Sequence, residues 1–423
     1  MSRQHRPMLA LSLIALVMTL LLASGAFYVA RGADPIKIGF GMALTGGLSA
    51  NGKPALLAMQ IWKDDVNKKG GLLGRQVELV FYDDQTNPST VPGIYSKLLD
   101  VDKVDFIVSG YGTNLIAPLM PIAMERKLTL VGIFGLANNE KYKYPNYFQI
   151  SPNGPDPEIS TPQGFFELAA KQNPKPQTVA IVGADAEYPQ NALVGSRELI
   201  KRFGFKTVYD KTYPPSTVDY TPIVRAIKAT NPDVVFIASY PPDSVGMLRA
   251  IHEVGLSPKM VGGGMVGLQF TSVMTSMGSM LNGIVNYDFW APESTMMFPG
   301  IKEFFAQYQP RAQKESMDPL GYYLPPYSYA AMQVLGQAIE ATKGLDQQKV
   351  ADYIRATEFS TIVGKVKFGK NGEWAQGRTL MVQYQKIQGN SVDQFRGPGK
   401  KVVLFPDEFK SGTIIYPYSA AKN

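Results

Sequence analysis

The sequence contains no cysteine and only two histidines in 423 residues. Without cysteine the chain can form neither disulfides nor thiolate metal sites, and an N-terminal lipid would have no cysteine to attach to. His5 lies in a segment that we expect to be cleaved off, so a catalytic triad or a histidine metal site would depend entirely on His252. The apolar pattern around His252 instead favours a position on the flank of a surface helix.

Motifs of nucleotide-binding and hydrolytic enzymes are also scarce. There is no G-x-S-x-G nucleophile elbow and no G-x-x-x-x-G-K-S/T phosphate-binding loop. Gly262–Gly267 matches G-x-G-x-x-G, and Asp288 follows 21 residues later, where a ribose-binding acid would stand. Because an exported protein meets little free dinucleotide, we interpret this stretch as a glycine-rich loop at a strand end, beside a ligand. Asp185 and Glu187 are interpreted as solvated turn residues, so we expect no catalytic residue, cofactor or metal ion.

The bulk composition is that of a globular protein, with 45% hydrophobic and 18% charged residues. At the usual ~100–200 residues per domain, the length predicts two domains. The formal net charge is +7, and Arg3, Arg6 and Arg31 supply three of the positive charges before residue 34. Acids and bases are well mixed elsewhere, which argues against a nucleic-acid-binding surface.

The N-terminus has the pattern of an export signal. Arg3 and Arg6 precede an apolar run over residues 8–23, and small residues follow it. This order predicts a secretory signal peptide over residues 1–26, with Ala33 as a later candidate cleavage position. An uncleaved membrane anchor is the alternative, since the run is near the lower length limit for a spanning helix. We expect a soluble periplasmic protein without a lipid anchor.

Strand and helix patterns alternate along most of the chain, which predicts βαβ units and parallel sheets. A first series precedes the Pro-, Gly- and Asn-rich stretch at 151–157, and a second series follows it. Two such series, with helices and short strands left over at the end, predict two α/β lobes and more than one crossover between them. The predicted strands are 36–41, 77–83, 106–109, 129–131, 178–182, 206–213, 234–238, 259–262 and 283–289, and the predicted helices are 53–67, 89–99, 191–203, 220–230, 243–254, 269–277, 300–309, 327–343 and 347–356.

Two glycine-rich turns, at residues 109–114 and 132–138, follow two of these strands. The first turn leads into a helical segment and offers backbone N–H groups and small hydroxyls at its start. Unpaired amides and the positive end of a helix dipole can bind an anion without a fixed cation. Open α/β sheets place ligands at the carboxyl ends of their strands, so these turns predict an anion-binding pocket; two ordinary βα loops are the alternative. Pro118 and Pro121 favour a helix that begins nearer Pro118.

Aromatic side chains recur in the loops that follow the predicted strands. Each one alone would fit a core position, but their repetition at one edge of the predicted sheets indicates an aromatic-lined cleft. These residues are Tyr111, Phe134, Tyr188, Tyr240, Phe270, Phe289 and Trp290.

Four stretches resemble the branched-chain amino-acid-binding (Leu/Ile/Val) family of type I periplasmic solute-binding proteins of ABC transporters: IKIGFGMALTGGLSANG (36–52), VNKKGGLLGRQVELVFYDDQTNPSTV (66–91), GADAEYPQN (183–191) and DVVFIASYPPDSVGMLRAIHEVGL (233–256). The resemblance implies two doubly wound parallel-sheet lobes, joined by three hinge strands, that close on a ligand. It implies lobe I at 34–153 and 293–362, and lobe II at 154–292 and 363–423. The implied partners are an inner-membrane permease and its cytoplasmic ATPases, and we expect a monomer.

Carried over residue by residue, the resemblance implies a ligand site. The hydroxyl that holds the ligand carboxylate falls on Thr113, followed by Asn114, and the backbone contact of the second turn falls on Gly135 and Leu136. Tyrosines that line the cleft fall on Tyr188 and Tyr240. Two positions depart from the family pattern, because a threonine is replaced by Ala137 and the acid that pairs with the α-ammonium falls where this chain has Gly263, Gly264 and Met265. Tyr111 and Phe134 complete the predicted set.

The departures determine the expected ligand. A buried ammonium without a charged partner loses roughly 3–5 kcal/mol, which is about two to four decades in affinity. We therefore expect a small carboxylate without an α-ammonium, and the aromatic residues favour an aromatic acid. An amino acid is the alternative if Asp185, Glu187 or Asp243 supplies the missing charge. An exported hydrolase or dehydrogenase on the same scaffold and a ligand-sensing domain are further alternatives.

Overall fold

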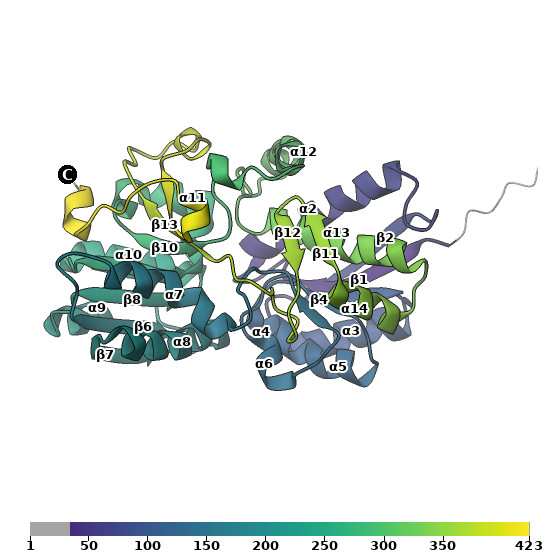
Figure 1. The fold of residues 1–423 in the computed structure, drawn as a ribbon, viewed down its shortest axis with the longest axis horizontal. Coiled ribbons are helices and arrows are strands. Elements are labelled where there is room, and N and C mark those ends of the chain that lie inside the picture. Colours follow the sequence, from purple (N-terminus) through teal and green to yellow (C-terminus); the bar gives the residue numbers. More distant parts are fainter. Residues whose placement is uncertain (1–33, 423) are drawn as a thin grey trace, which may run out of the picture. The chain divides into compact units, whose positions relative to one another are not determined.

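Two open sheets organise the chain (Figure 1). This computed structural model describes residues 34–422, so the predicted signal peptide lies outside the described residues. All elements named below belong to one unit that begins at Ile36. Within the described residues, no helix combines the length and the apolar character that crossing a membrane requires.

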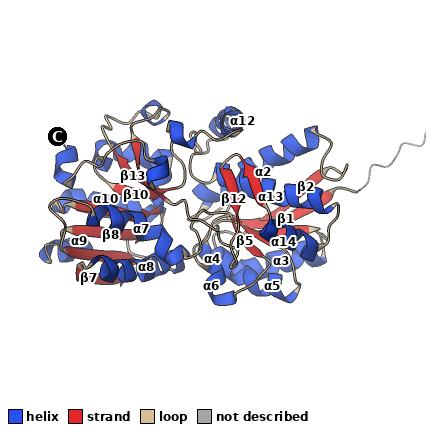
Figure 2. Cartoon of the chain, viewed as in Figure 1, coloured by secondary structure: helices blue, strands red, loops and turns tan. Residues whose placement is uncertain are grey.

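The first sheet is entirely parallel, with the strand order β2-β1-β3-β4-β5. Its strands are short apolar runs, as expected where helices cover both faces of a parallel sheet; Figure 2 shows helices around its strands. The strands are β1 (Ile36–Met42), β2 (Val77–Asp83), β3 (Phe106–Val108), β4 (Leu130–Gly132) and β5 (Tyr147–Gln149), and the helices are α2 (Ser49–Lys68), α3 (Val91–Asp100), α4 (Thr113–Ile116), α5 (Met120–Glu125) and α6 (Asn138–Tyr142).

The helical segment after β3 is divided into short pieces. α4 begins at Thr113, a 3₁₀ turn covers Ala117–Leu119, and α5 begins at Met120. Pro118 and Pro121 stand in the first turns of the second and third pieces, where a missing N–H costs little. The first helical turn therefore starts in the glycine-rich loop itself, ahead of Pro118.

The second sheet has seven strands in the order β14-β13-β10-β9-β8-β6-β7, and β13 runs antiparallel to both of its neighbours. The helix α7 (Pro157–Ala170) was not predicted from the sequence, because Pro162 interrupts its helical pattern. The strands are β6 (Thr178–Ala184), β7 (Lys206–Tyr213), β8 (Val234–Ser239), β9 (Met260–Met265), β10 (Val285–Asp288), β13 (Leu380–Tyr384) and β14 (Lys401–Phe405), and the helices are α7 (Pro157–Ala170), α8 (Glu187–Phe203), α9 (Thr221–Ala229), α10 (Pro241–Val254) and α11 (Thr271–Met277).

The strand predicted at 259–262 continues to Met265 and is followed by a 3₁₀ turn at Val266–Gln269, which corrects the interpretation of the G-x-G-x-x-G stretch as a loop at the strand end. Gly262, Gly263 and Gly264 lie inside β9, and Gly262 has a φ of +145°. A Cβ on Gly262 would lie 1.6 Å from the carbonyl oxygen of Val285, so this glycine permits the close pairing of β9 with β10. Asp288, the supposed ribose acid, is buried in an ion pair with Lys401.

The segment after the second sheet returns to the first. It forms α12 (Ile301–Lys314), α13 (Pro325–Thr342), α14 (Gln347–Ala356) and the hairpin β11 (Glu358–Thr361)–β12 (Gly364–Lys367). Arg311 on α12 pairs with Asp64 on α2 at 3.1 Å, and Gly336 on α13 packs closely on the Trp62 ring.

The chain thus passes between the two sheets three times, through residues 150–156, 289–300 and 368–379. These passages agree with the expected three-segment connection of two α/β lobes. The lobe boundaries themselves stay predictions; the one placed at 362/363 falls in the turn of the β11–β12 hairpin, ahead of the third passage.

A buried acid stands in the third passage. The turn at 369–375 packs on β5, where Gln149 N–H donates to the Gly372 carbonyl at 2.8 Å. Glu373 is 1% exposed, and its Oε2 has no hydrogen-bond partner. Burial, reinforced by the nearby negative charge of Glu140, raises the pKa of Glu373 well above its usual value. The folded protein therefore favours the protonated carboxyl.

We expect Glu373→Gln to stabilise the protein at neutral pH by about 1–3 kcal/mol, the scale of one unsatisfied buried group. A folded-state pKa above the unfolded value means that the wild-type group contributes its full stability below pH 4.5, and that this contribution is lost as the pH rises. The advantage of the glutamine variant should therefore shrink on acidification. Urea unfolding across this pH range measures it; an advantage that grows at low pH contradicts the assignment.

Candidate ligand-binding pocket

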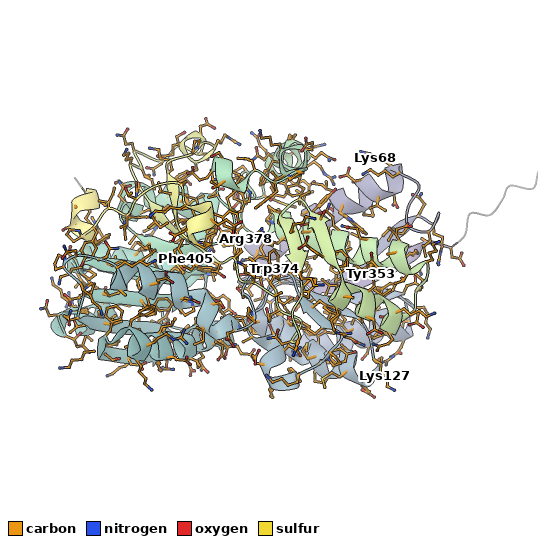
Figure 3. All side chains as sticks on the ribbon, viewed as in Figure 1. Lys68, Lys127, Tyr353, Trp374, Arg378 and Phe405 are labelled. Carbon is orange, nitrogen blue, oxygen red and sulfur yellow. The ribbon has the colours of Figure 1, made fainter. Side chains whose placement is uncertain are left out.

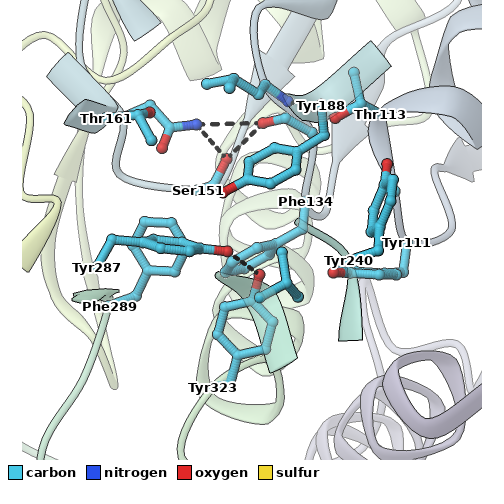
Figure 4. Close-up of a pocket in the computed structure, with 15 residues that line it drawn as sticks. Tyr111, Thr113, Phe134, Ser151, Thr161, Tyr188, Tyr240, Tyr287, Phe289 and Tyr323 are labelled. Atoms are coloured by element: carbon cyan, nitrogen blue, oxygen red, sulfur yellow. Dashed lines mark hydrogen bonds between the residues drawn. The ribbon is translucent and has the colours of Figure 1, made fainter. Parts of the chain in front are cut away.

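A buried pocket lies at the carboxyl ends of strands from both sheets (Figure 4). Its cavity measures about 30 Å³, which is room for about two water molecules, so a larger ligand requires the lining side chains to move apart. Residues from the first sheet, the second sheet and the passages between them all contribute. The lining consists of Tyr111, Gly112, Thr113, Phe134, Gly135, Leu136, Ser151, Asn153, Thr161, Tyr188, Tyr240, Val266, Tyr287, Phe289 and Tyr323.

Thr113 joins the two glycine-rich turns. Its Oγ1 accepts a hydrogen bond from the Leu136 N–H at 3.0 Å, and its carbonyl accepts from Asn138 Nδ2 at 2.9 Å. The hydroxyl proton of Thr113 has no acceptor among the described residues, and the side chain is buried at the pocket wall. The Leu136 amide is thus occupied within the protein, whereas the Thr113 hydroxyl keeps a donor for a ligand.

The second turn presents another unused donor. No acceptor among the described residues receives the N–H of Gly135, while its carbonyl accepts from Ser151 Oγ at 3.1 Å and Asn153 Nδ2 at 3.2 Å. The N–H groups of Thr113 and Asn114 stand in the first turn of α4, where no helical carbonyl precedes them. This end of the pocket is therefore rich in neutral donors.

Aromatic rings form the rest of the wall (Figure 4). Phe134 packs edge-on against Phe289 and Tyr323, with ring centroids 5.0 and 5.2 Å apart, and Tyr188 lies 5.7 Å from Tyr240. Burial raises the pKa of all five lining tyrosines. They therefore stay neutral phenols that can donate to an acceptor, and their faces offer an apolar surface.

At the pocket, two hydrogen bonds directly join residues that follow strands of the first sheet to residues that follow strands of the second. Asn191 Nδ2 on α8 donates to the Leu136 carbonyl at 2.9 Å, and the Tyr240 hydroxyl donates to Asn114 Oδ1 at 3.4 Å. Tyr188 is held by a bond from its hydroxyl to the Gly264 carbonyl at 2.9 Å. The sheets are thus joined at the pocket by polar side chains as well as by rings.

No charged residue lines this pocket. Asp243 lies elsewhere, accepting from the hydroxyls of Tyr213 and Tyr220 at 3.2 Å each. Asp185 and Glu187 are exposed. His252 is exposed on α10, and the described residues contain no cluster of three or more acids, histidines or cysteines that would suit a metal ion. The pocket offers neither a counter-charge for an ammonium nor a general base.

Eight residues predicted from the sequence lie in the pocket wall: Tyr111, Thr113, Phe134, Gly135, Leu136, Tyr188, Tyr240 and Phe289. Phe270 and Trp290, which were predicted as cleft aromatics, lie outside the lining. Asn114, Ala137, Gly264 and Met265 lie outside the lining, although Asn114 and Gly264 hydrogen-bond residues that belong to it. For all of these residues, inside and outside the lining, contact with a ligand stays a prediction.

Sequence reasoning missed several lining residues. Tyr287 stands two positions before Phe289, so strand alternation would have placed both on one face. Tyr323 lies in the segment before α13, and Asn153 lies in the first passage. No local pattern marked either of these two residues.

The sequence from residue 35 to residue 389 matches the model of the family described as periplasmic binding protein. The match covers well over half of the chain, and the protein therefore belongs to this family. The Leu/Ile/Val-binding protein homolog 8 of Brucella abortus (strain 2308) is 24% identical over 394 residues, spanning 91% of this chain and 93% of the relative.

Two solved structures have the same fold. The leucine-binding protein LivK of Thermotoga maritima aligns with a TM-score of 0.73 and 21% identity, over 88% of this chain and 99% of that one. An ABC-transporter solute-binding protein of R. palustris in complex with 4-hydroxybenzoate aligns with a TM-score of 0.72 and 20% identity, over 84% and 95%. The expected type I periplasmic binding fold is confirmed.

Proposed function

We propose that this protein is the periplasmic solute-binding component of an ABC importer and that its ligand is a small aromatic carboxylate without an α-ammonium. The observation that carries the proposal is the combination of neutral hydrogen-bond donors, aromatic walls and no charged side chain in one buried pocket. Such a site stabilises one negative group through dipoles. It offers no counter-charge to a buried positive group.

The carboxylate would lie beside the two turns. The Thr113 hydroxyl and the N–H of Gly135 are donors without partners among the described residues, and hydrogen bonds to a charged acceptor are about twice as strong as neutral ones. The first turn of α4 adds the N–H groups of Thr113 and Asn114 on the same side.

The ring of the ligand would lie between Phe134 and the tyrosines of the second sheet. The solved relative from R. palustris holds 4-hydroxybenzoate, a ligand of this class. Because the cavity is small, the lining must separate for entry and close afterwards. A ligand favours closure only if it contacts both halves, which an aromatic acid held by Thr113 and Tyr188 would do.

An amino acid is the second candidate, favoured by the names of the leucine-binding relatives. Binding of an amino acid would require an acidic side chain of the protein to move into the pocket. Asp243 would have to leave two tyrosine hydroxyls, and Asp185 and Glu187 would have to leave solvent. The ligand without an ammonium requires none of these movements.

Matched pairs of ligands test the proposal. Hydrocinnamate is phenylalanine without its amino group, and isocaproate is leucine without its amino group. We expect each acid to bind more tightly than its amino acid by about two to four decades, since an unpaired buried ammonium costs roughly 3–5 kcal/mol. Isothermal titration calorimetry measures each Kd. Tighter binding of leucine or phenylalanine than of its deaminated partner would show that an acid reaches the pocket.

A further inference from the structure

A second, larger cavity of about 1030 Å³ shares no lining residue with the ligand pocket. Its wall includes α12, α13, the β11–β12 hairpin, the third passage and residues that follow β14. Arg378 in the third passage belongs to this wall, and Figure 3 shows it beside Trp374.

Arg378 is a buried cation without an anionic partner. It is 8% exposed, and the described part of the chain gives it no ion pair. Its Nη2 donates to the Val363 carbonyl and to the Tyr327 hydroxyl, whereas its Nε has no partner. No described residue accepts a hydrogen bond from its Nη1. A buried guanidinium normally occurs with a carboxylate or phosphate that uses its donors.

Aromatic rings surround this guanidinium. Its central carbon lies 4.8 Å from the ring centroid of Phe298, 4.9 Å from that of Trp374 and 5.7 Å from that of Phe409. Cation–π contacts offset part of the cost of burying the charge, but they satisfy none of its N–H donors.

Four acids line the same cavity, and none forms an ion pair with Arg378: Asp65 and Glu358 have partners of their own, and Glu303 and Glu408 are exposed. Asp65 accepts from the Tyr329 hydroxyl at 2.8 Å and from Gln307 Nε2 at 3.2 Å, and Glu358 pairs with Lys365 at 3.3 Å. Lys69, Lys365 and Lys367 contribute positive charge to the wall. Acids and bases thus balance in number in the wall, and Arg378 differs from the other charged residues by its burial and its unused donors.

We propose that this cavity is a second binding site, for a small oxyanion, and that the Nη1 donors of Arg378 hold a carboxylate or phosphate oxygen there. The bound anion would contact Arg378 in the third passage, and the hydrogen bonds of Arg378 and Tyr327 connect that passage to the other two. The Arg378 N–H donates to the Pro152 carbonyl at 2.7 Å in the first passage, and its partner Tyr327 donates to the Phe289 carbonyl at 2.8 Å in the second.

Fluorine NMR of the full-length protein labelled with fluorotryptophan tests this site. The chain has three tryptophans, and Trp374→Phe identifies the signal of the one beside Arg378. Inorganic phosphate and acetate are titrated separately, with the ionic strength held constant by chloride. We expect a saturable shift of the Trp374 signal with at least one of the two anions, and Arg378→Met should abolish it.

Gln376, an exposed residue of the same wall, provides a matched pair that leaves Arg378 intact. Gln376→Glu adds a negative charge and should weaken anion binding about threefold or more, because like charges repel; Gln376→Ala should bind as the wild type does. A shift with phosphate alone or acetate alone identifies the class of anion. Shifts no larger than those with chloride, undiminished binding by Arg378→Met, or equal binding by the two Gln376 variants would overturn the proposal.

Discussion

On the proposed function, replacing Thr113 by valine is expected to weaken the binding of an aromatic acid, with 4-hydroxybenzoate as the probe, by about 1–3 kcal/mol, which is about 5- to 150-fold in Kd. The substitution keeps the shape of the side chain and removes its hydroxyl. The ligand then loses a donor to its carboxylate, and the Leu136 N–H loses the acceptor that lies 3.0 Å away. Both lost hydrogen bonds involve the two glycine-rich turns that would hold the carboxylate. Calorimetric titration of the wild type and the variant measures the change.

Thr113→Ser is the matched control. It restores the hydroxyl without the methyl group and should recover most of the affinity, whereas a purely steric role would leave both variants equally weak. Thermal unfolding without ligand measures the separate cost of the orphaned Leu136 amide. An unchanged Kd in the valine variant would remove Thr113 from the ligand site and would leave the second site at Arg378 unaffected.

Replacing Lys401 by methionine is expected to destabilise the protein by about 3–5 kcal/mol. Lys401 on β14 and Asp288 on β10 are 1% and 0% exposed and form an ion pair across β13. Asp288 Oδ1 also accepts the Phe289 N–H at 2.8 Å, next to the ligand pocket. Removing the lysine leaves a buried carboxylate without its cation. Urea unfolding gives the loss in free energy.

The double variant Asp288→Leu/Lys401→Met separates charge from packing. A buried ion pair replaced by apolar residues of similar size is often neutral in stability, so the double variant should recover most of what the single variant loses. A single variant within about 1 kcal/mol of the wild type would show that water or another group reaches Asp288. Equal losses in both variants would mean that the lysine acts through its packing.

Much of the fold was predictable because its signals are local. β2, β7 and α14 have the predicted bounds, since runs rich in β-branched and aromatic residues and helical periodicity are visible within a few residues. Shorter elements such as β5 and α6 were not predicted, and two further departures have clear physical reasons. Pro162 interrupts the pattern of α7, and the glycines of β9 have no strand propensity of their own. They are strand residues because β8 and β10 pair with them on both sides.

About half of the pocket wall followed from the rule that ligands lie at the carboxyl ends of parallel strands. Tyr111, Phe134, Tyr188 and Tyr240 each stand at or just beyond such an end. Tyr323 does not, because it comes from a segment that returns after the second sheet is almost complete. Asn153 likewise joins the pocket only through the first passage.

The sequence by itself determined the alternation of strands and helices, the two glycine-rich turns and the shortage of chemically reactive side chains, because each is a property of neighbouring residues. Only the tertiary structure decided which donors remain unused, that the acids point elsewhere, and that Arg378 is buried among rings without a carboxylate. These depend on contacts between residues far apart in the chain. Such contacts form when three passages bring two sheets together, and no local pattern specifies them.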